Sequence, residues 1–110
     1  MIATFRAKGP KWSYAKIKDG IIVEVAEKVE ISNDATVGIY GWTKGADFVR
    51  YAEQMISKGI RSNGEFYIAP VYNQSISELD KVLPFPVLSM HGIGTPEDLE
   101  EYLEKNCTQR

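Results

Sequence analysis

Residues 2–7 alternate weakly between apolar and polar positions, and the apolar runs that follow have strong β-propensity, so the first part of the chain predicts a set of β-strands. An Asp19-Gly20 dipeptide separates the second strand from the third, which is typical of a tight hairpin. The fourth segment is apolar on both faces and therefore predicts a central strand. Gly38 inside it indicates either a bulge or tight helix crossing, or the close approach of a ligand. The expected strands are residues 2–7, 13–17, 21–26 and 35–42.

Residues 46–58 carry the clearest helical pattern in the chain. Gly59 follows the last periodic position, and Ile60 is placed to fold back on the final turn as in a Schellman motif. The apolar face of this helix is expected to belong to the core. Its members are Phe48, Tyr51, Ala52, Met55 and Ile56.

Residues 63–76 predict a second helical region. Asn63 is a suitable N-cap, and Pro70 predicts a kink or a division into two short helices. Four polar side chains in this region either reach a polar ligand or belong to a capped, half-buried helix. These are Asn63, Glu65, Tyr67 and Tyr72.

A strand, a glycine turn and a helix are expected near the end of the chain. The apolar run over residues 82–90 predicts a short strand at 87–90, and Gly92 and Gly94 follow it. These glycines either only form the turn or let the backbone approach a ligand. Thr95 is a suitable N-cap for a helix over residues 96–105, in which Pro96 takes the first position and Asp98 completes a capping box. This helix is expected to bury Leu99, Tyr102 and Leu103.

Composition places the chain among soluble single-domain proteins. It has 110 residues, and its formal net charge is -2 with scattered basic residues, which disfavours a nucleic-acid partner. No run is long enough to span a membrane, and the first residues lack the apolar region of a signal peptide, so we expect a cytoplasmic protein. Cys107 is the sole cysteine and is expected to be a surface thiol.

The residues by themselves support little catalytic chemistry. His91 and Cys107 cannot form a metal cluster of familiar spacing, and no Gly-x-Ser-x-Gly elbow or Walker loop is present. His91 is either a structural or surface residue or a general base. Glu27 and Lys28 are neighbours, so they can serve one ligand only where a strand ends or bends; otherwise they are solvated surface charges.

Several stretches, in order, resemble the C-terminal half of sugar-phosphate nucleotidyltransferases, specifically the bacterial capsule and lipopolysaccharide branch related to glucose-1-phosphate thymidylyltransferase. The resemblance covers nearly the whole chain, as a single domain over residues 1–110, and implies an α/β fold with a mixed sheet and flanking helices, part of the Rossmann-like GT-A fold. The matching stretches are residues 12–15, 23–28, 35–40, 63–67, 69–73 and 90–99.

The resemblance also implies a site for a sugar 1-phosphate. Glu27 resembles the glutamate that holds sugar hydroxyls, and Lys28 resembles the lysine that neutralises the sugar phosphate. Val37 and Gly38 match the strand whose backbone lines the sugar pocket. The segment from Asn63 to Glu65 matches the helix start that closes the pocket.

The family's glycine-rich nucleotide loop and first metal-binding aspartate have no counterpart in this chain, and Gly92 stands where many relatives have a second metal-binding aspartate. Mg²⁺ is expected only for a complete family enzyme, so we expect no cofactor and no nucleotidyl transfer by this chain alone. An exposed sheet edge and apolar surface are expected to lead to a homodimer or a higher homo-oligomer, with the homodimer favoured. The alternatives are an interaction module with a vestigial site and a half-enzyme complemented by a separate nucleotide-binding chain.

Overall fold

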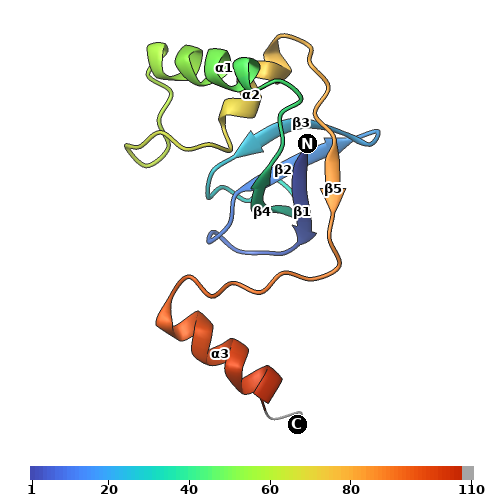
Figure 1. The fold of residues 1–110 in the computed structure, drawn as a ribbon, viewed down its shortest axis with the longest axis vertical. Coiled ribbons are helices and arrows are strands. Elements are labelled where there is room, and N and C mark those ends of the chain that lie inside the picture. Colours follow the sequence, from blue (N-terminus) through green and yellow to red (C-terminus); the bar gives the residue numbers. More distant parts are fainter. Residues whose placement is uncertain (108–110) are drawn as a thin grey trace.

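The computed structural model describes residues 1–107, which form one five-stranded sheet and three helices (Figure 1). The expected α/β class with a mixed sheet and flanking helices is confirmed. The strands are β1 (Ile2–Arg6), β2 (Tyr14–Lys18), β3 (Ile21–Ala26), β4 (Asp34–Tyr40) and β5 (Pro84–Pro86). The helices are α1 (Gly45–Ser57), α2 (Val71–Ser77) and α3 (Pro96–Cys107).

The strand order in the sheet is β3-β2-β4-β1-β5. All neighbours pair antiparallel except β1 and β5, which are parallel. Asp19 and Gly20 form the hairpin between β2 and β3, both with a positive φ, as the sequence predicts. The central position of β4 agrees with its apolar character on both faces.

Of the two sheet edges, β3 is capped by Asn73 of α2 and by the Val82 segment, whereas β5 is the exposed edge and presents two prolines. The backbone N–H of Val25 in β3 donates to Asn73 Oδ1 at 2.8 Å, and Asn73 Nδ2 donates to the Val25 carbonyl at 2.7 Å. The N–H of Ile22 donates to the Val82 carbonyl at 2.8 Å. At the other edge, β5 begins with Pro84 and ends with Pro86, and neither has an N–H to offer a further strand.

The core lies between one face of the sheet and the pair α1 and α2. Tyr72 on α2 is buried, and its ring stacks on Trp42 with centroids 4.3 Å apart, which joins the two parts of the core. The predicted Schellman end of α1 is confirmed, since Gly59 N–H donates to the Ile56 carbonyl and Ile60 N–H to the Met55 carbonyl. Ile56 itself is exposed, contrary to the prediction that it packs in the core.

Two element predictions near the middle and end of the chain are wrong. Residues 63–69 contain no helix; Asn63 and Gly64 instead form a two-residue turn, with reciprocal backbone hydrogen bonds between Ser62 and Glu65 of 2.8 and 3.0 Å. The Asn-Gly turn preference prevails over helix capping here. The short strand lies at Pro84–Pro86 rather than at residues 87–90, which are irregular.

Helix α3 projects from the rest of the molecule (Figure 1) and meets it through the contact of Asp98 with Lys11, which lies in the loop before β2. Its predicted start is confirmed, because Asp98 N–H donates to Thr95 Oγ1 at 3.1 Å. Its predicted burial is wrong: Leu99 is 43% and Leu103 45% exposed. The side chain of Cys107 lies outside the described residues. None of the described helices has the length and apolar character that crossing a membrane requires.

Candidate functional site

A groove of about 460 Å³ opens between the ends of β2 and β3, the middle of β4 and the loop that precedes α2. Its walls combine aromatic rings, hydroxyl groups and one carboxylate. The lining residues are Lys11, Trp12, Ser13, Glu27, Thr36, Val37, Gly38, Tyr40, Phe66, Tyr67, Ile68 and Ala69.

Glu27 supplies the carboxylate of the groove. It directly follows β3, and the pairing of Tyr14 with Ala26 places Ser13 opposite Glu27 on the neighbouring strand. The Ser13 hydroxyl donates to Glu27 Oε2 in a close hydrogen bond. This bond fixes the orientation of the carboxylate, and Glu27 Oε1 remains able to accept hydroxyl donors from the groove.

Lys28 follows Glu27 just beyond the end of β3. Neighbouring side chains such as these can serve one ligand only at a place where the strand ends or bends, and both residues lie at such a place. The φ of Lys28, 56°, is left-handed and ends the alternation of the strand. The side chain is exposed, and its ammonium lies 5.8 Å from the centroid of the Tyr67 ring, which lines the groove. The structure thus brings the cation close to the rim and the carboxylate into the wall.

A bulge in β4 supplies the backbone part of the groove. Ile2 pairs with Tyr40 but Thr4 pairs with Thr36, so the residues between 36 and 40 outnumber those opposite them. Gly38 has a φ of 102°, and a Cβ placed there would meet no heavy atom within 4 Å. Glycine is therefore required for backbone conformation, and the open space at Gly38 belongs to the groove.

Tyr40 and Thr36 form the polar part of this wall. Their hydroxyl groups lie 3.0 Å apart across the bulge. Burial raises the pKa of Tyr40, so its hydroxyl is protonated at neutral pH and can take part in hydrogen bonds as donor or acceptor.

The opposite wall comes from the segment that follows the Asn63-Gly64 turn. The nearby Glu65 carboxylate raises the pKa of Tyr67, so the phenol is protonated at neutral pH. Asn63 and Glu65 are exposed and do not line the groove. Of the six residues that the resemblance assigns to a sugar-phosphate site, the structure gathers Glu27, Val37 and Gly38 in the groove and Lys28 near it.

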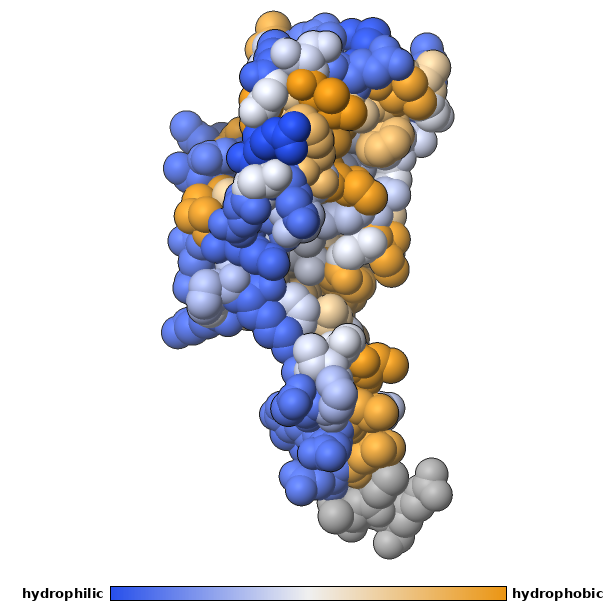
Figure 2. Space-filling model, turned by 90° about the vertical axis from the view of Figure 1, so that its left-hand side faces the viewer, coloured by the Kyte–Doolittle hydropathy of each residue, from blue (hydrophilic) through white to orange (hydrophobic). Residues whose placement is uncertain are grey.

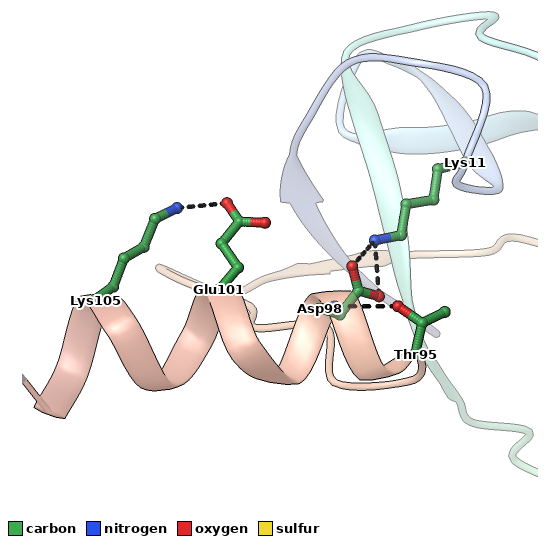
Figure 3. Close-up of polar contacts among 5 residues, drawn as sticks. All are labelled: Lys11, Thr95, Asp98, Glu101 and Lys105. Carbon is green, nitrogen blue, oxygen red and sulfur yellow. Dashed lines mark hydrogen bonds and ion pairs between the residues drawn. The ribbon is translucent and has the colours of Figure 1, made fainter.

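Lys11 connects the groove to a second, smaller cleft beside α3. Its Nζ donates to both carboxylate oxygens of Asp98, at 2.9 and 3.0 Å (Figure 3). The same Nζ lies 4.9 Å from the centre of the Trp12 ring. The ammonium of Lys11 lowers the pKa of Asp98. The ring of His91 meets Tyr102 edge-on at 5.1 Å within this cleft, and Gly92 packs beside Trp12.

Three hydroxyl-bearing side chains of the groove, and Lys11 beside them, are not assigned to a site by the sequence: Ser13, Thr36 and Tyr40. The period-two spacing of Thr36 and Tyr40 along one strand was the available signal, but the bulge that orients them is not visible in the sequence. Among residues 1–107, no three histidine, cysteine, aspartate or glutamate side chains gather closely enough to hold a metal ion.

No protein-family model and no curated protein matches this sequence. The fold is similar to that in the crystal structure of the nucleoside-diphosphate-sugar pyrophosphorylase from Vibrio cholerae RC9, with a TM-score of 0.85 and 24% sequence identity. The similarity covers 94% of this chain and 45% of that chain, so the present sequence spans less than half of its length. This similarity shows that the two chains share a fold over the matched region.

Proposed function

We propose that this chain binds a phosphorylated sugar in the groove, as the C-terminal, sugar-phosphate-binding half of a nucleotidyltransferase-like protein of the thymidylyltransferase branch. The observation that supports this most directly is the position of Glu27 in an aromatic-walled groove, with the ammonium of Lys28 5.8 Å from the centroid of the Tyr67 ring that lines it. The similarity of fold to a nucleoside-diphosphate-sugar pyrophosphorylase supports the same assignment.

The chemistry of the groove suits a sugar. The oriented carboxylate of Glu27 accepts hydrogen bonds from sugar hydroxyls, and Thr36 and Tyr40 add hydroxyl groups. Aromatic side chains such as Trp12 and Tyr67 offer flat apolar surfaces for a sugar ring. Lys28 provides a point charge that a phosphate at the rim would attract.

We propose further that nucleotidyl transfer does not take place on this chain alone. Phosphoryl transfer depends on metal ions that neutralise phosphate oxygens, and Gly92 contributes only backbone where the family resemblance places a carboxylate. A complementing chain that supplies a nucleotide site would then be needed. Mixing the protein with a separately expressed nucleotide-binding half and measuring pyrophosphate release tests this part of the proposal.

Titration with glucose 1-phosphate, followed by amide chemical shifts, tests ligand binding. The expected result is saturable shifts at Glu27, Lys28 and Gly38, with glucose and inorganic phosphate each binding more weakly than the combined ligand. Glu27→Gln and Lys28→Met are each expected to weaken binding by about tenfold or more, because each removes a charge-assisted contact.

Glu24→Gln and Lys18→Met are matched controls, since both side chains are exposed on the same hairpin and lie outside the groove lining. Both control variants are expected to bind glucose 1-phosphate with the affinity of the unsubstituted chain. An absence of shifts near Glu27 at millimolar ligand would refute sugar-phosphate binding and would favour an interaction module with a vestigial site.

Self-association is the second function that a specific observation favours. Large apolar side chains are more than two-fifths exposed on α1, on β5 and on α3, and Figure 2 shows apolar surface on one side of the body that continues along α3. We propose that the chain forms a homodimer that covers part of this surface. Sedimentation velocity over micromolar concentrations tests it, and a monomer at all concentrations would refute it.

A further inference from the structure

Lys11 lies in a wall that the groove shares with a second cavity. It lines the groove and also the cleft of about 190 Å³ beside α3, and Trp12 lines both cavities with it. In the structure the ammonium of Lys11 faces the cleft, where it donates to both carboxylate oxygens of Asp98 (Figure 3). A lysine side chain has a flexible four-carbon stem, so rotation about its bonds can direct the charge to either cavity.

The segment before α3 packs on the same wall. A Cβ placed at Gly92 would lie 3.4 Å from the Trp12 ring and 3.8 Å from Lys11 Nζ. The ammonium of Lys11 itself lies 4.9 Å from the centre of that ring. The docking of α3 and the shape of the groove wall therefore depend on the same two side chains, Lys11 and Trp12.

A phosphate in the groove would need more positive charge than Lys28 supplies. A phosphate monoester carries about −1.5 to −2 charges at neutral pH, and Glu27 in the wall adds a further negative charge. The ammonium of Lys28 compensates only one of these charges. Among the described residues that line the groove, the basic one is Lys11. Charge balance therefore favours the approach of Lys11 to a bound phosphate.

The contact of Lys11 with Asp98 holds α3 only weakly. The Lys11 side chain is 52% exposed, and ion pairs that are this accessible to water contribute little to stability. Helix α3 has only 12 residues, and because Leu99 and Leu103 are 43% and 45% exposed, packing of its apolar face does little to hold it in place. A phosphate carries more negative charge than the single carboxylate of Asp98, so it competes with that carboxylate for the ammonium.

We propose that Lys11 is a second phosphate-binding residue of the groove, and that its ammonium leaves Asp98 for the ligand when a sugar phosphate binds. This inference rests on the proposed sugar-phosphate binding and adds to it a residue and a means of regulation. Docking of α3 through Asp98 withdraws positive charge from the groove, and a bound ligand releases the first turn of α3. Because such coupling is reciprocal, any change that weakens the contact with Asp98 strengthens ligand binding.

A double-mutant cycle tests this exchange, with glucose 1-phosphate as the ligand and amide chemical shifts as the measurement. Lys11→Met is expected to weaken binding about threefold or more, because it removes one cation from the phosphate. Asp98→Asn is expected to tighten binding about threefold, because it frees the ammonium of Lys11. In the double variant, Asp98→Asn is expected to add nothing to the effect of Lys11→Met. Glucose without a phosphate is expected to bind all four proteins alike.

Amide hydrogen exchange of residues 99–106 gives a second measurement, which a purely structural role of Lys11 would not make sensitive to the ligand. Saturation with glucose 1-phosphate is expected to speed exchange in α3 of the unsubstituted chain. In Lys11→Met, exchange is expected to be fast without ligand and unchanged by it. Glu101→Gln is the matched control and is expected to leave the affinity unchanged, because Glu101 lines the same cleft but pairs with Lys105 at 2.9 Å. Circular dichroism verifies that each variant is folded.

The possible results separate this inference from the proposal on which it rests. Equal affinities of Asp98→Asn and the unsubstituted chain would overturn the exchange and leave sugar-phosphate binding intact. The same gain from Asp98→Asn in the Lys11→Met background would also overturn it, since the gain would then come from the loss of a negative charge alone. An unchanged affinity of Lys11→Met would exclude Lys11 from the site. An absence of binding by all four proteins would refute the proposed function, and the exchange with it.

Discussion

The most informative single substitution is Asn73→Ala, which removes the side chain that closes the β3 edge. Both hydrogen bonds of Asn73 go to the backbone of Val25, at 2.8 and 2.7 Å. Each such bond contributes about 1 kcal/mol net, and the partly buried N–H of Val25 would lose its partner at a further cost. The expected loss of unfolding free energy is about 2 to 3 kcal/mol. Val25 stands two residues before Glu27, so sugar-phosphate affinity is expected to fall as well.

Urea denaturation at neutral pH measures this loss, with the dependence of unfolding free energy on urea expected to stay unchanged. Asn33→Ala is the control, because the Asn33 side chain is exposed, and its stability is expected to change by less than about 0.5 kcal/mol. A loss of less than about 0.5 kcal/mol for Asn73→Ala would refute the reasoning.

Asn73→Asp separates the two bonds. A carboxylate still accepts the Val25 N–H but faces the Val25 carbonyl without a proton to donate. The carbonyl favours the protonated carboxyl, so the folded-state pKa is raised above its unfolded value. The stability of this variant, relative to the unsubstituted chain, is therefore expected to be higher at acid pH and to fall as the pH rises through the folded-state pKa. A relative stability that is constant with pH would contradict a donating role for Asn73.

Three further predictions follow from local geometry. Gly38→Ala is expected to lower the unfolding free energy, measured by urea denaturation, by about 1 to 3 kcal/mol, because φ is 102° at this position. Gly94→Ala is the control: Gly94 has open space around it and no positive φ, so its unfolding free energy is expected to change little. Tyr72→Phe is expected to lose about 1 to 2 kcal/mol by the same measurement, because its hydroxyl donates to the carbonyls of Met1 and Gly41. Lys11→Ala is expected to raise the pKa of Asp98 in a carboxyl NMR titration, because the ammonium of Lys11 lowers that pKa in the folded chain. In the unsubstituted chain, the contact between Lys11 and Asp98 is expected to weaken as the pH falls through the folded-state pKa of Asp98.

Much of the fold follows from local sequence signals because the decisive interactions are short-range. The hairpin at Asp19-Gly20 and the end of α1 at Gly59 each depend on a glycine with a positive φ next to a strongly patterned segment. The N-cap at Thr95 depends only on the next turn of its helix. In these cases local preference and tertiary structure agree.

The misplaced strand depends on a partner that is distant in the sequence, whereas the missed turn at Asn63-Gly64 is a local preference that competes with helix capping. β5 tolerates Pro84 and Pro86 because it pairs with β1 through the residues around them: Ile2 N–H donates to the Leu83 carbonyl and Val87 N–H to the Thr4 carbonyl. The sequence pattern of α3 correctly predicts that Leu99 and Leu103 share one side of the helix, but it does not predict that this side is exposed. Similarly, the sequence predicts Glu27 and Gly38 as site residues, while their meeting in one groove depends on the pairing of Ser13 and on the β4 bulge.

The left-handed backbone at Lys28 has a consequence for attempts to stabilise this protein. A side chain at a φ of 56° costs about 1 kcal/mol relative to glycine, so Lys28→Gly is expected to relieve strain while it removes the cation at the groove rim. Selection of variants for heat resistance alone would therefore favour loss of this lysine. Selection for ligand binding would retain it, and the two selections are expected to diverge at this position.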